Sequence, residues 1–550
     1  MTESEEIDHR EVHWIDGVVE DLDRHGDDRL VFSTAKTPSG PIHVGVGREL
    51  IYCNVLQQLL RERGRETAFL FFVDDFDSLK SFPSGTPPEF TRHTEYLGKP
   101  LYQVPCPYGH CESWAKHYAQ ELLDTFPAFN INPRTFWTHE VYAGEGMKSL
   151  IRTALNRVED LRAILRDVVG STLDGQRLEA FQREMEGWFP CLTICENCGR
   201  LKTTKVTAYN PSTDKLTYTC SACNHTGEVK LRDWPVKLRW RIDWPAKWSL
   251  FKVSCEPAGK DHAVKGGAYD TGERIAEQVF GWKGPYRISY EWILLGERAM
   301  KTHKGISFTF AEWLAIAPPE TYRYMILRES PRRHISFAPE RLLQLIDEFE
   351  RAERIYYNLE KPANPEEREQ IERIYPISMP SGAPSTPPRH LPYRFAVILT
   401  QLTPLMGKEK VKAKSLSVLQ KLYETPPTAE DAEEAEGRLK MAEYWVQNYA
   451  PPQAKIEITT TIQPEVKSRL TPEEKEGLKA LATMLREKEW NEDALQYEVF
   501  ELGKRLGIGT KIFTAVYLAF LGRKFGPRLA SFLLSLDRDF TLRRLDEAAT

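Results

Sequence analysis

Residues 29–73 read RLVFSTAKTPSGPIHVGVGRELIYCNVLQQLLRERGRETAFLFFV and decide the fold class. The apolar run at 29–35 predicts a short buried strand, and a glycine-rich loop leads from it into a periodic helix at about 48–63. Gly64 ends that helix, and 67–73 predict a second buried strand. Strand, loop, helix and strand in this order form a βαβ unit. We therefore predict an α/β fold built on a parallel sheet.

Length and composition indicate a large globular protein. Of 550 residues, 41% are hydrophobic and 11% aromatic, which is enough to bury several cores. The first residues, MTESEEIDHREVHW, are acidic and polar, and no stretch approaches the roughly 18 to 20 apolar residues of a membrane span. We therefore expect a cytoplasmic protein with no membrane partner. A net charge of −5 argues against general coating of nucleic acid but allows local basic patches.

Four cysteines in two pairs predict a metal site. Cys195-Glu-Asn-Cys198 and Cys220-Ser-Ala-Cys223 each place two thiols in one turn, and tetrahedral Zn²⁺ favours four thiolates. The alternatives are two disulfides or buried thiols without metal, which nothing else in the composition favours. Because four cysteines leave no open coordination position, we expect a structural zinc in an inserted module.

The loop after the first strand is typical of a phosphate site. Residues 37–45 (TPSGPIHVG) run from a strand into a helix N-terminus, where backbone N–H groups attract phosphate. His43 can donate to a phosphoryl oxygen, and Gly40 and Gly45 allow a ligand to approach the backbone. A histidine near a glycine would equally fit an ordinary turn, but the full run is more specific.

Several motifs together resemble one family. The loop at 37–45 is similar to the HIGH element of class I aminoacyl-tRNA synthetases, in the form Thr-Pro-Ser-Gly-x-x-His-x-Gly. VDDFDSLK, LRWRIDWPAKW, EPAGKDH, AYDTG and ISYEW follow in the order and spacing of class I lysyl-tRNA synthetases, and GIGTKIFTAVYLAFLGRKFGPRLASFL near the C-terminus also resembles that family. The resemblance covers most of residues 12–545. It implies ATP with Mg²⁺ as cofactors, structural Zn²⁺, and lysine and tRNA(Lys) as substrates.

The reaction that the resemblance implies has two steps. The lysine carboxylate attacks the α-phosphorus of ATP to form lysyl-adenylate, and a 3′ ribose hydroxyl of tRNA then takes the lysyl group. We favour a monomer. Two alternatives stay open: a paralogue that passes an activated amino acid to another acceptor, and a non-catalytic tRNA-binding or regulatory protein.

The family's second ATP loop, Lys-Met-Ser-x-Ser-Lys-Gly-Asn, is altered here to AMKTHKGI at residues 299–306. Met300, Lys304 and Gly305 match the family form. Ala299 stands in place of the first lysine, and both serines are missing. The resemblance therefore leaves the rate of activation open.

Charge in this loop occurs at shifted positions. Lys301 and His303 could restore positive charge, although a solvated basic loop is the alternative interpretation. The HIGH-like loop also differs from the family form, because Val46 stands in place of a polar residue. The resemblance implies catalytic roles for His43, Gly45, Lys301 and Lys304. It implies ATP contacts at Thr37, Pro38, Ser39, Gly40, His43, Gly45, Gly259, Asp261, Met300 and Lys304.

A second group of metal-binding residue types lies at 106–117. Cys106-Pro-Tyr-Gly-His110-Cys111 is followed by His117, so four soft ligands lie close together in sequence. The family has metal-capable residues at the same four places, with permuted types. We predict a second Zn²⁺ here, against the alternative of a polar loop leading into an amphipathic helix.

The amino-acid pocket is inferred from the resemblance and from strand ends. Trp240, Trp244 and Trp248 recur every four residues, which predicts one helix face packed in a core. Asp74 follows the second strand, at the sheet edge where α/β proteins bind ligands, and could hold an ammonium; a salt bridge or a helix cap is the alternative. The lysine-binding residues implied are Ala35, Thr37, Asp74, Trp240, His262 and Tyr290.

We divide the chain into an α/β, Rossmann-like catalytic domain with a zinc-binding insertion, followed by an all-helical C-terminal region. Two stretches, 376–392 and 425–437, predict linkers or exposed loops. The predicted regions are 12–100 (first half of the catalytic domain), 101–236 (inserted zinc-binding, acceptor-stem module), 237–317 (second half, with the altered loop), 318–392 (connecting helices and linker) and 393–550 (anticodon-binding helices).

Overall fold

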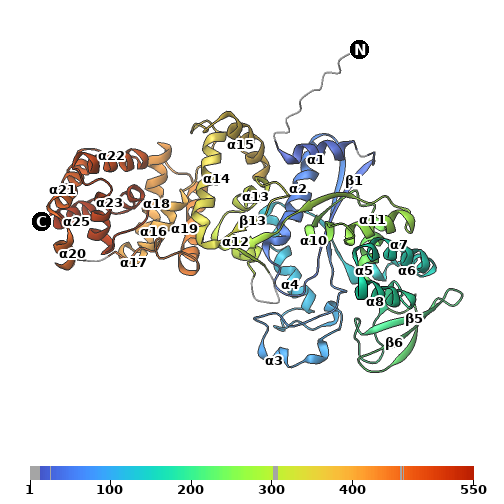
Figure 1. Ribbon diagram of the computed structural model, residues 1–550. Helices are drawn as coiled ribbons and strands as arrows, with labels where there is room; N and C mark the ends of the chain where they lie inside the picture. Colours follow the sequence, from blue (N-terminus) through green and yellow to red (C-terminus); the bar gives the residue numbers. More distant parts are fainter. Residues whose placement is uncertain (1–12, 25, 301–306, 459–460, 463) are drawn as a thin grey trace, which may run out of the picture. The chain divides into compact units, whose positions relative to one another are not determined.

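The chain forms two compact units in a computed structural model (Figure 1). The first unit comprises Met1–Trp313, Tyr322–Phe337 and Pro362–Ala383, and the second comprises Leu314–Thr321, Ala338–Lys361 and Pro384–Thr550. The structure describes all residues except 1–12, 25, 301–306, 459–460 and 463. Lys301 and Lys304 therefore lie outside the described residues. None of the described helices is long and apolar enough to cross a membrane.

A five-stranded parallel sheet is the centre of the first unit, which confirms the predicted fold class. The strand order is β10-β9-β1-β2-β3. β1 and β2 pair in parallel from Arg29 opposite Glu66 to Lys36 opposite Val73, and α2 (Gly47–Glu62) connects them. The strands are β1 (Arg29–Lys36), β2 (Glu66–Val73), β3 (Arg134–Trp137), β9 (Cys255–Gly259) and β10 (Tyr286–Tyr290).

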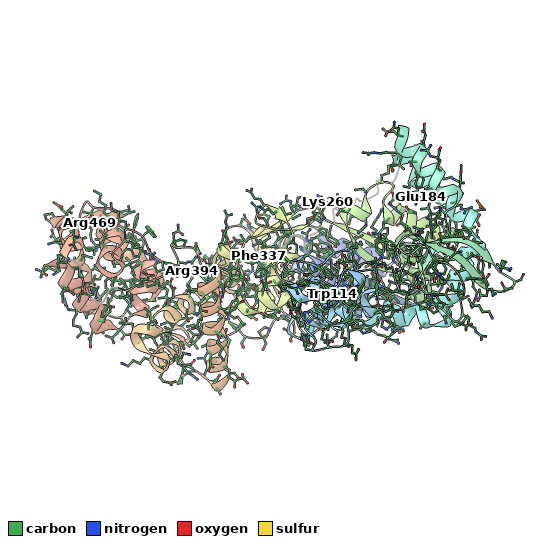
Figure 2. The ribbon with its side chains drawn as sticks, turned by 90° about the horizontal axis from the view of Figure 1, so that it is seen from below. Trp114, Glu184, Lys260, Phe337, Arg394 and Arg469 are labelled. Carbon is green, nitrogen blue, oxygen red and sulfur yellow. The ribbon has the colours of Figure 1, made fainter. Side chains whose placement is uncertain are left out.

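The segment between β2 and β9 adds helices and small sheets to this core. β3, the edge strand of the main sheet, also comes from this segment. A hydrophobic cluster joins its helices to the cysteine pairs and to α9 (Trp240–Phe251). A smaller cluster surrounds Trp114, which is fully buried (Figure 2). The main added elements are α4 (Trp114–Leu123), α6 (Glu145–Asn156), α7 (Val158–Val168), α8 (Gly175–Glu186) and the antiparallel strands β5 (Thr204–Asn210), β6 (Lys215–Cys220) and β7 (Thr226–Lys230).

The described part of the second unit is helical. Its helices include α14 (Leu342–Tyr356), α16 (Tyr393–Gln401), α18 (Lys408–Tyr423), α19 (Ala429–Asn448), α21 (Pro472–Glu487), α22 (Glu492–Arg505), α23 (Lys511–Leu521), α24 (Leu529–Ser535) and α25 (Arg538–Ala549).

One predicted loop in the second unit is wrong. Most of 425–437 belongs to α19, which begins at Ala429. Thr428 and Asp431 form a capping box, in which the threonine side chain accepts from the Asp431 N–H and the aspartate accepts from the Thr428 N–H. Such caps satisfy the free N–H groups of a helix start, so the acidic residues begin a helix rather than a linker. The other predicted linker stays non-helical from Met379 to Pro392.

Candidate active site

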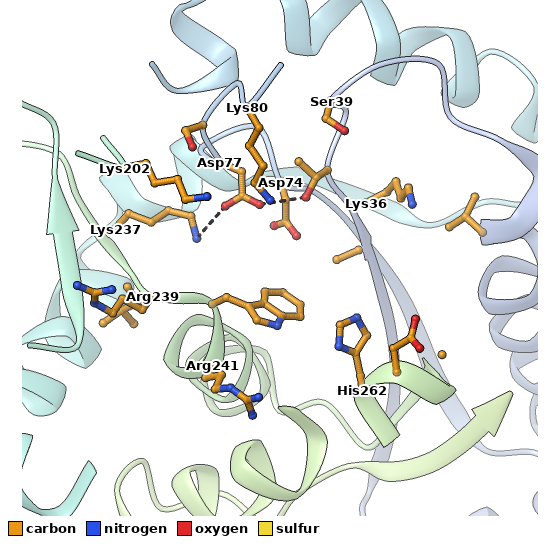
Figure 3. Close-up of a pocket in the computed structure, with 18 of the residues that line it drawn as sticks. Lys36, Ser39, Asp74, Asp77, Lys80, Lys202, Lys237, Arg239, Arg241 and His262 are labelled. Atoms are coloured by element: carbon orange, nitrogen blue, oxygen red, sulfur yellow. Dashed lines mark hydrogen bonds and ion pairs between the residues drawn. The ribbon is translucent and has the colours of Figure 1, made fainter. Parts of the chain in front are cut away.

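A cavity of about 1270 Å³ opens at the carboxyl ends of β1, β2, β9 and β10 (Figure 3). Ligands of open parallel sheets bind at this edge. The cavity wall continues onto the inserted segment through α8 and the strands beside the cysteine pairs. Of the predicted ATP and lysine residues, the structure brings together Ala35, Thr37, Ser39, Gly40, His43, Gly45, Asp74, Trp240, Gly259, Asp261, His262, Tyr290 and Met300; Pro38 is buried and does not line the cavity.

His43 faces the cavity as a neutral donor. Its Nδ1 accepts a hydrogen bond from the Gly45 N–H at 3.1 Å, which leaves the proton on Nε2. Burial, and to a lesser degree the charge of Lys36, lower the pKa of His43 to about 3. The imidazole therefore stays neutral at physiological pH and can donate from Nε2 to a phosphoryl oxygen.

The backbone of the nucleotide loop, residues 37–47, is supported from behind. Val44 N donates to Phe308 O at 2.7 Å, and Tyr322 Oη donates to Val44 O at 2.5 Å. A Cβ at Gly47 would lie 1.8 Å from Tyr322 Oη, so only glycine fits at that position. These contacts also tie the loop to the residues that follow the altered second loop.

A half-buried carboxylate in the cavity wall was not predicted. Glu49, in the first turn of α2, accepts hydrogen bonds from the hydroxyls of Thr34 and Tyr290. Burial raises the pKa of Glu49, and the two hydroxyls and Lys36 oppose that rise. An acidic residue in a first helical turn is common because it stabilises the helix dipole, so the sequence carried no signal of a site. The site is recognised only in the folded structure, where the Tyr290 hydroxyl lies against Glu49.

The four paired cysteines lie at zinc-ligand distances. Cys195 Sγ is 3.6 Å from Cys223 Sγ, and Cys198 Sγ is 3.7 Å from Cys220 Sγ. Four thiolates bound to one tetrahedral zinc at about 2.3 Å are separated by about 3.8 Å. All four sulfurs lie within 4.8 Å of one another and none forms a disulfide. The donor set therefore fits Zn²⁺.

The second group also converges, in a more exposed place. The ligand atoms of Cys106, His110, Cys111 and His117 lie within 4.8 Å of one another. His110 Nε2 is 3.1 Å from His117 Nδ1, close to the roughly 3.3 Å between two imidazole ligands of a tetrahedral zinc. His117 Nε2 lies 3.4 Å from the carboxylate of Glu121, an arrangement common behind metal-bound histidines. These four residues also fit Zn²⁺.

Comparison with known proteins agrees with this geometry. A family model described as tRNA synthetases class I (K) matches residues 12–381, and one described as an anticodon binding domain matches residues 439–549. The chain belongs to the class I (K) family of tRNA synthetases.

Relatives named lysine–tRNA ligase match this synthetase over nearly its whole length. The protein of Methanocaldococcus jannaschii is 34% identical over 545 residues, covering 97% of this chain and 99% of the relative. That of Thermococcus kodakarensis is 35% identical over 544 residues, covering 97% and 99%. That of Methanosphaera stadtmanae is 31% identical over 546 residues, covering 97% and 98%.

The carboxylate of Asp74 in the synthetase is already paired with a lysine. Lys247 Nζ lies 2.5 Å from Asp74 Oδ1 and 3.3 Å from Asp243 Oδ2, and Thr138 Oγ1 donates to Asp74 Oδ1 at 2.8 Å. Burial alone would raise the pKa of Asp243, but Lys237 and Lys247 lower it to about 2. Asp74 is therefore half of a buried ion pair, which is the alternative that the sequence left open, and Glu49 is the better-placed anion.

A second unpredicted carboxylate supports the aromatic wall of the synthetase cavity. Glu256 accepts from Trp244 Nε1 and Trp248 Nε1, each at 2.7 Å, and from Ser33 Oγ at 2.5 Å. Trp244 stacks on Trp240, with ring centroids 5.0 Å apart. Trp244 and Trp248 are buried, as predicted, whereas Trp240 is 40% exposed and faces the cavity. A charged residue inside an otherwise apolar strand was the available signal for Glu256.

Proposed function

We propose that this chain is a lysine–tRNA ligase that forms lysyl-adenylate in the cavity at the sheet edge. The observation that carries the proposal is the placement of two complementary groups in one cavity. The neutral His43 donor lies in the nucleotide loop, and the hydrogen-bonded Glu49–Tyr290 pair lines the same cavity. A donor for phosphate and an anion for an ammonium suit ATP and lysine.

The chain's residues position the substrates and stabilise charge. Glu49 binds the ε-ammonium of lysine, and Tyr290 orients that carboxylate through its hydroxyl. Ala35, Thr37, Trp240 and His262 line the space for the rest of the amino acid. The lysine carboxylate then attacks the α-phosphorus in line, and pyrophosphate leaves. Positioning and charge account for such a reaction without a covalent intermediate on the enzyme.

Donors along the nucleotide loop hold ATP. His43 Nε2–H donates to a phosphoryl oxygen, and Gly40 and Gly45 bring backbone close to the nucleotide. Lys304, with Lys301, supplies charge on the pyrophosphate side. Mg²⁺ accompanies ATP, as in the family.

Both metal clusters are proposed to hold structural zinc that shapes the inserted segment for the tRNA acceptor end. Residues 439–549, which match an anticodon binding domain, are proposed to hold the anticodon of tRNA(Lys). We also propose a cytoplasmic location, which reduced thiols in both clusters favour.

The test is lysine-dependent ATP–pyrophosphate exchange, followed by charging of tRNA(Lys). Glu49→Gln should raise the KM for lysine about 10- to 100-fold, because a charge-assisted contact to the ammonium is lost. Glu62→Gln, an exposed change at the end of the same helix, is the matched control. Exchange without charging would indicate a paralogue with another acceptor. Binding of tRNA with neither activity would indicate a non-catalytic protein.

A further inference from the structure

Lys36 is a cation inside the cavity that neither the family motifs nor the proposed mechanism uses. It is the last residue of β1, directly before the nucleotide loop, and it lines the cavity. Figure 3 shows it on the same side as His262, whereas Lys202, Lys237 and Arg239 lie on the opposite side. Its charge therefore lies at the nucleotide side.

Lys36 has no hydrogen-bond or ion-pair partner among the described residues, in contrast to the buried lysines Lys237 and Lys247. Lys237 Nζ lies 2.9 Å from Asp243 Oδ2, and Lys247 Nζ lies 2.5 Å from Asp74 Oδ1. Within the part of the chain that the structure describes, no hydrogen bond or ion pair holds the ammonium of Lys36, and burial lowers its pKa while the nearby charge of Glu49 opposes that change. The side chain is half-buried, and an ammonium that is partly removed from water without an acceptor is destabilised. A bound anion would remove that destabilisation.

The position of Lys36 relates to the altered loop. Ala299 lines the same cavity and carries no charge, although the family's loop has a lysine there. Lys36, His43 and His262 line the same cavity, and the charge of Lys36 lowers the pKa of both histidines. The anion expected near the His43 donor is a phosphate of ATP.

We propose that Lys36 is a catalytic residue that binds the phosphates of ATP and supplies positive charge that Ala299 cannot. This inference rests on the proposed function. A carboxylate oxygen of lysine forms a bond to the α-phosphorus, the bond from that phosphorus to the bridging oxygen breaks, and its electron pair leaves on pyrophosphate. The ammonium of Lys36 stabilises the negative charge on the phosphate oxygens during this exchange.

A double-mutant cycle with Lys36→Met and Ala299→Lys tests the proposal by lysine-dependent ATP–pyrophosphate exchange. Lys36→Met should lower kcat about 10- to 100-fold and change the KM for lysine less than about 3-fold. Adding Ala299→Lys should restore at least about 5-fold of that loss, while Ala299→Lys alone should raise the wild-type rate less than about 3-fold. Lys36→Arg, which keeps the charge, should retain more activity than Lys36→Met.

Three results would overturn the inference. An unchanged or faster rate in Lys36→Met would show that the ammonium is idle or repels the substrate ammonium near Glu49. A rise in the KM for lysine alone would assign Lys36 to the amino acid. Independent effects of the two substitutions on kcat, with no rescue of Lys36→Met by Ala299→Lys, would show that the two positions do not supply the same positive charge. Lys479→Met, exposed on α21, is the control, and melting temperatures separate misfolding from lost chemistry.

Failure of the proposed function would be visible separately. A wild-type chain without lysine-dependent exchange would reject the ligase. ATP binding by calorimetry would still test Lys36, because Lys36→Met should weaken it. Equal ATP affinity in the two proteins would then overturn the phosphate contact as well.

Discussion

The nucleotide loop lines the same cavity as Ala299 and Met300 of the altered second loop, yet only the nucleotide loop keeps its family form through His43. In the nucleotide loop, Tyr322 leaves no room for a Cβ at Gly47, and the Gly45 N–H fixes the tautomer of His43. In the second loop, Ala299 replaces a lysine. The difference suggests that the packing of Tyr322 against the nucleotide loop fixes the residue types there. A positive charge in the second loop, by contrast, can be supplied from another position that reaches the same ligand.

The largest expected effect comes from removing the imidazole donor of His43 in the nucleotide loop. His43→Ala should lower kcat for ATP–pyrophosphate exchange by about 100-fold or more, because a neutral donor to the transferring phosphoryl group is lost. Lysine binding, measured by calorimetry, should change little. His93→Ala, an exposed histidine beside Glu95, is the matched control. Unchanged exchange in His43→Ala would show that the loop does not bind phosphate.

The altered loop offers a sharper test through the order of two variants. Lys304→Ala should reduce exchange severely, and Lys301→Ala should reduce it less, because Lys301 stands where the family form has a serine. Steady-state exchange at saturating lysine measures both. The reverse order would show that Lys301 is the functional cation. No effect in either variant would remove this loop from the chemistry and favour a non-catalytic protein.

Much of the architecture follows from local pattern. The βαβ unit could be predicted because each element has its own periodicity, and the two C-x-x-C pairs because metal chemistry limits the spacing. The acidic start of α19 was missed although its Thr428–Asp431 cap is visible in the sequence. The pairing of Lys247 with Asp74, 173 residues apart, and of Glu256 with two tryptophan rings depends on tertiary packing, which no local pattern encodes.

The two clusters proposed to bind zinc differ in their surroundings, because one adjoins a large hydrophobic core and the other is more exposed. Cys198→Ser should release about one zinc per chain and lower the melting temperature markedly, because its cluster lies within a large hydrophobic core and binding energy there is folding energy. Cys111→Ser should release the other zinc with a smaller change, because His110 is exposed. Metal content and thermal unfolding measure both.

A buried cysteine outside the clusters provides the control. Cys191→Ala should lower the melting temperature without loss of zinc, since Cys191 is buried in the same core and is no ligand. Wild-type protein that is folded and free of metal under reducing conditions would reject both zinc sites.

The smallest expected effect concerns Glu256, which holds the tryptophan wall of the cavity. Its contribution to the free energy of unfolding depends on pH. Burial raises the pKa of Glu256 from 4.5 to about 7, although Ser33 and the two tryptophans donate to it. The folded protein therefore holds a proton that the unfolded chain releases between these values. The contribution of Glu256 to stability is present below pH 4.5 and declines as the pH rises to about 7, by at most about 1.4 kcal/mol per pH unit.

Glu256→Gln should remove that decline, because the amide does not ionise. Unfolding of the first unit, followed from pH 4.5 to 7.5, should show wild type losing stability relative to Glu256→Gln as the pH rises. Glu476→Gln, exposed on α21, should leave the wild-type profile unchanged. Parallel curves for wild type and Glu256→Gln would show that Glu256 is ionised throughout this range. The tryptophan wall would then be held by a charged carboxylate.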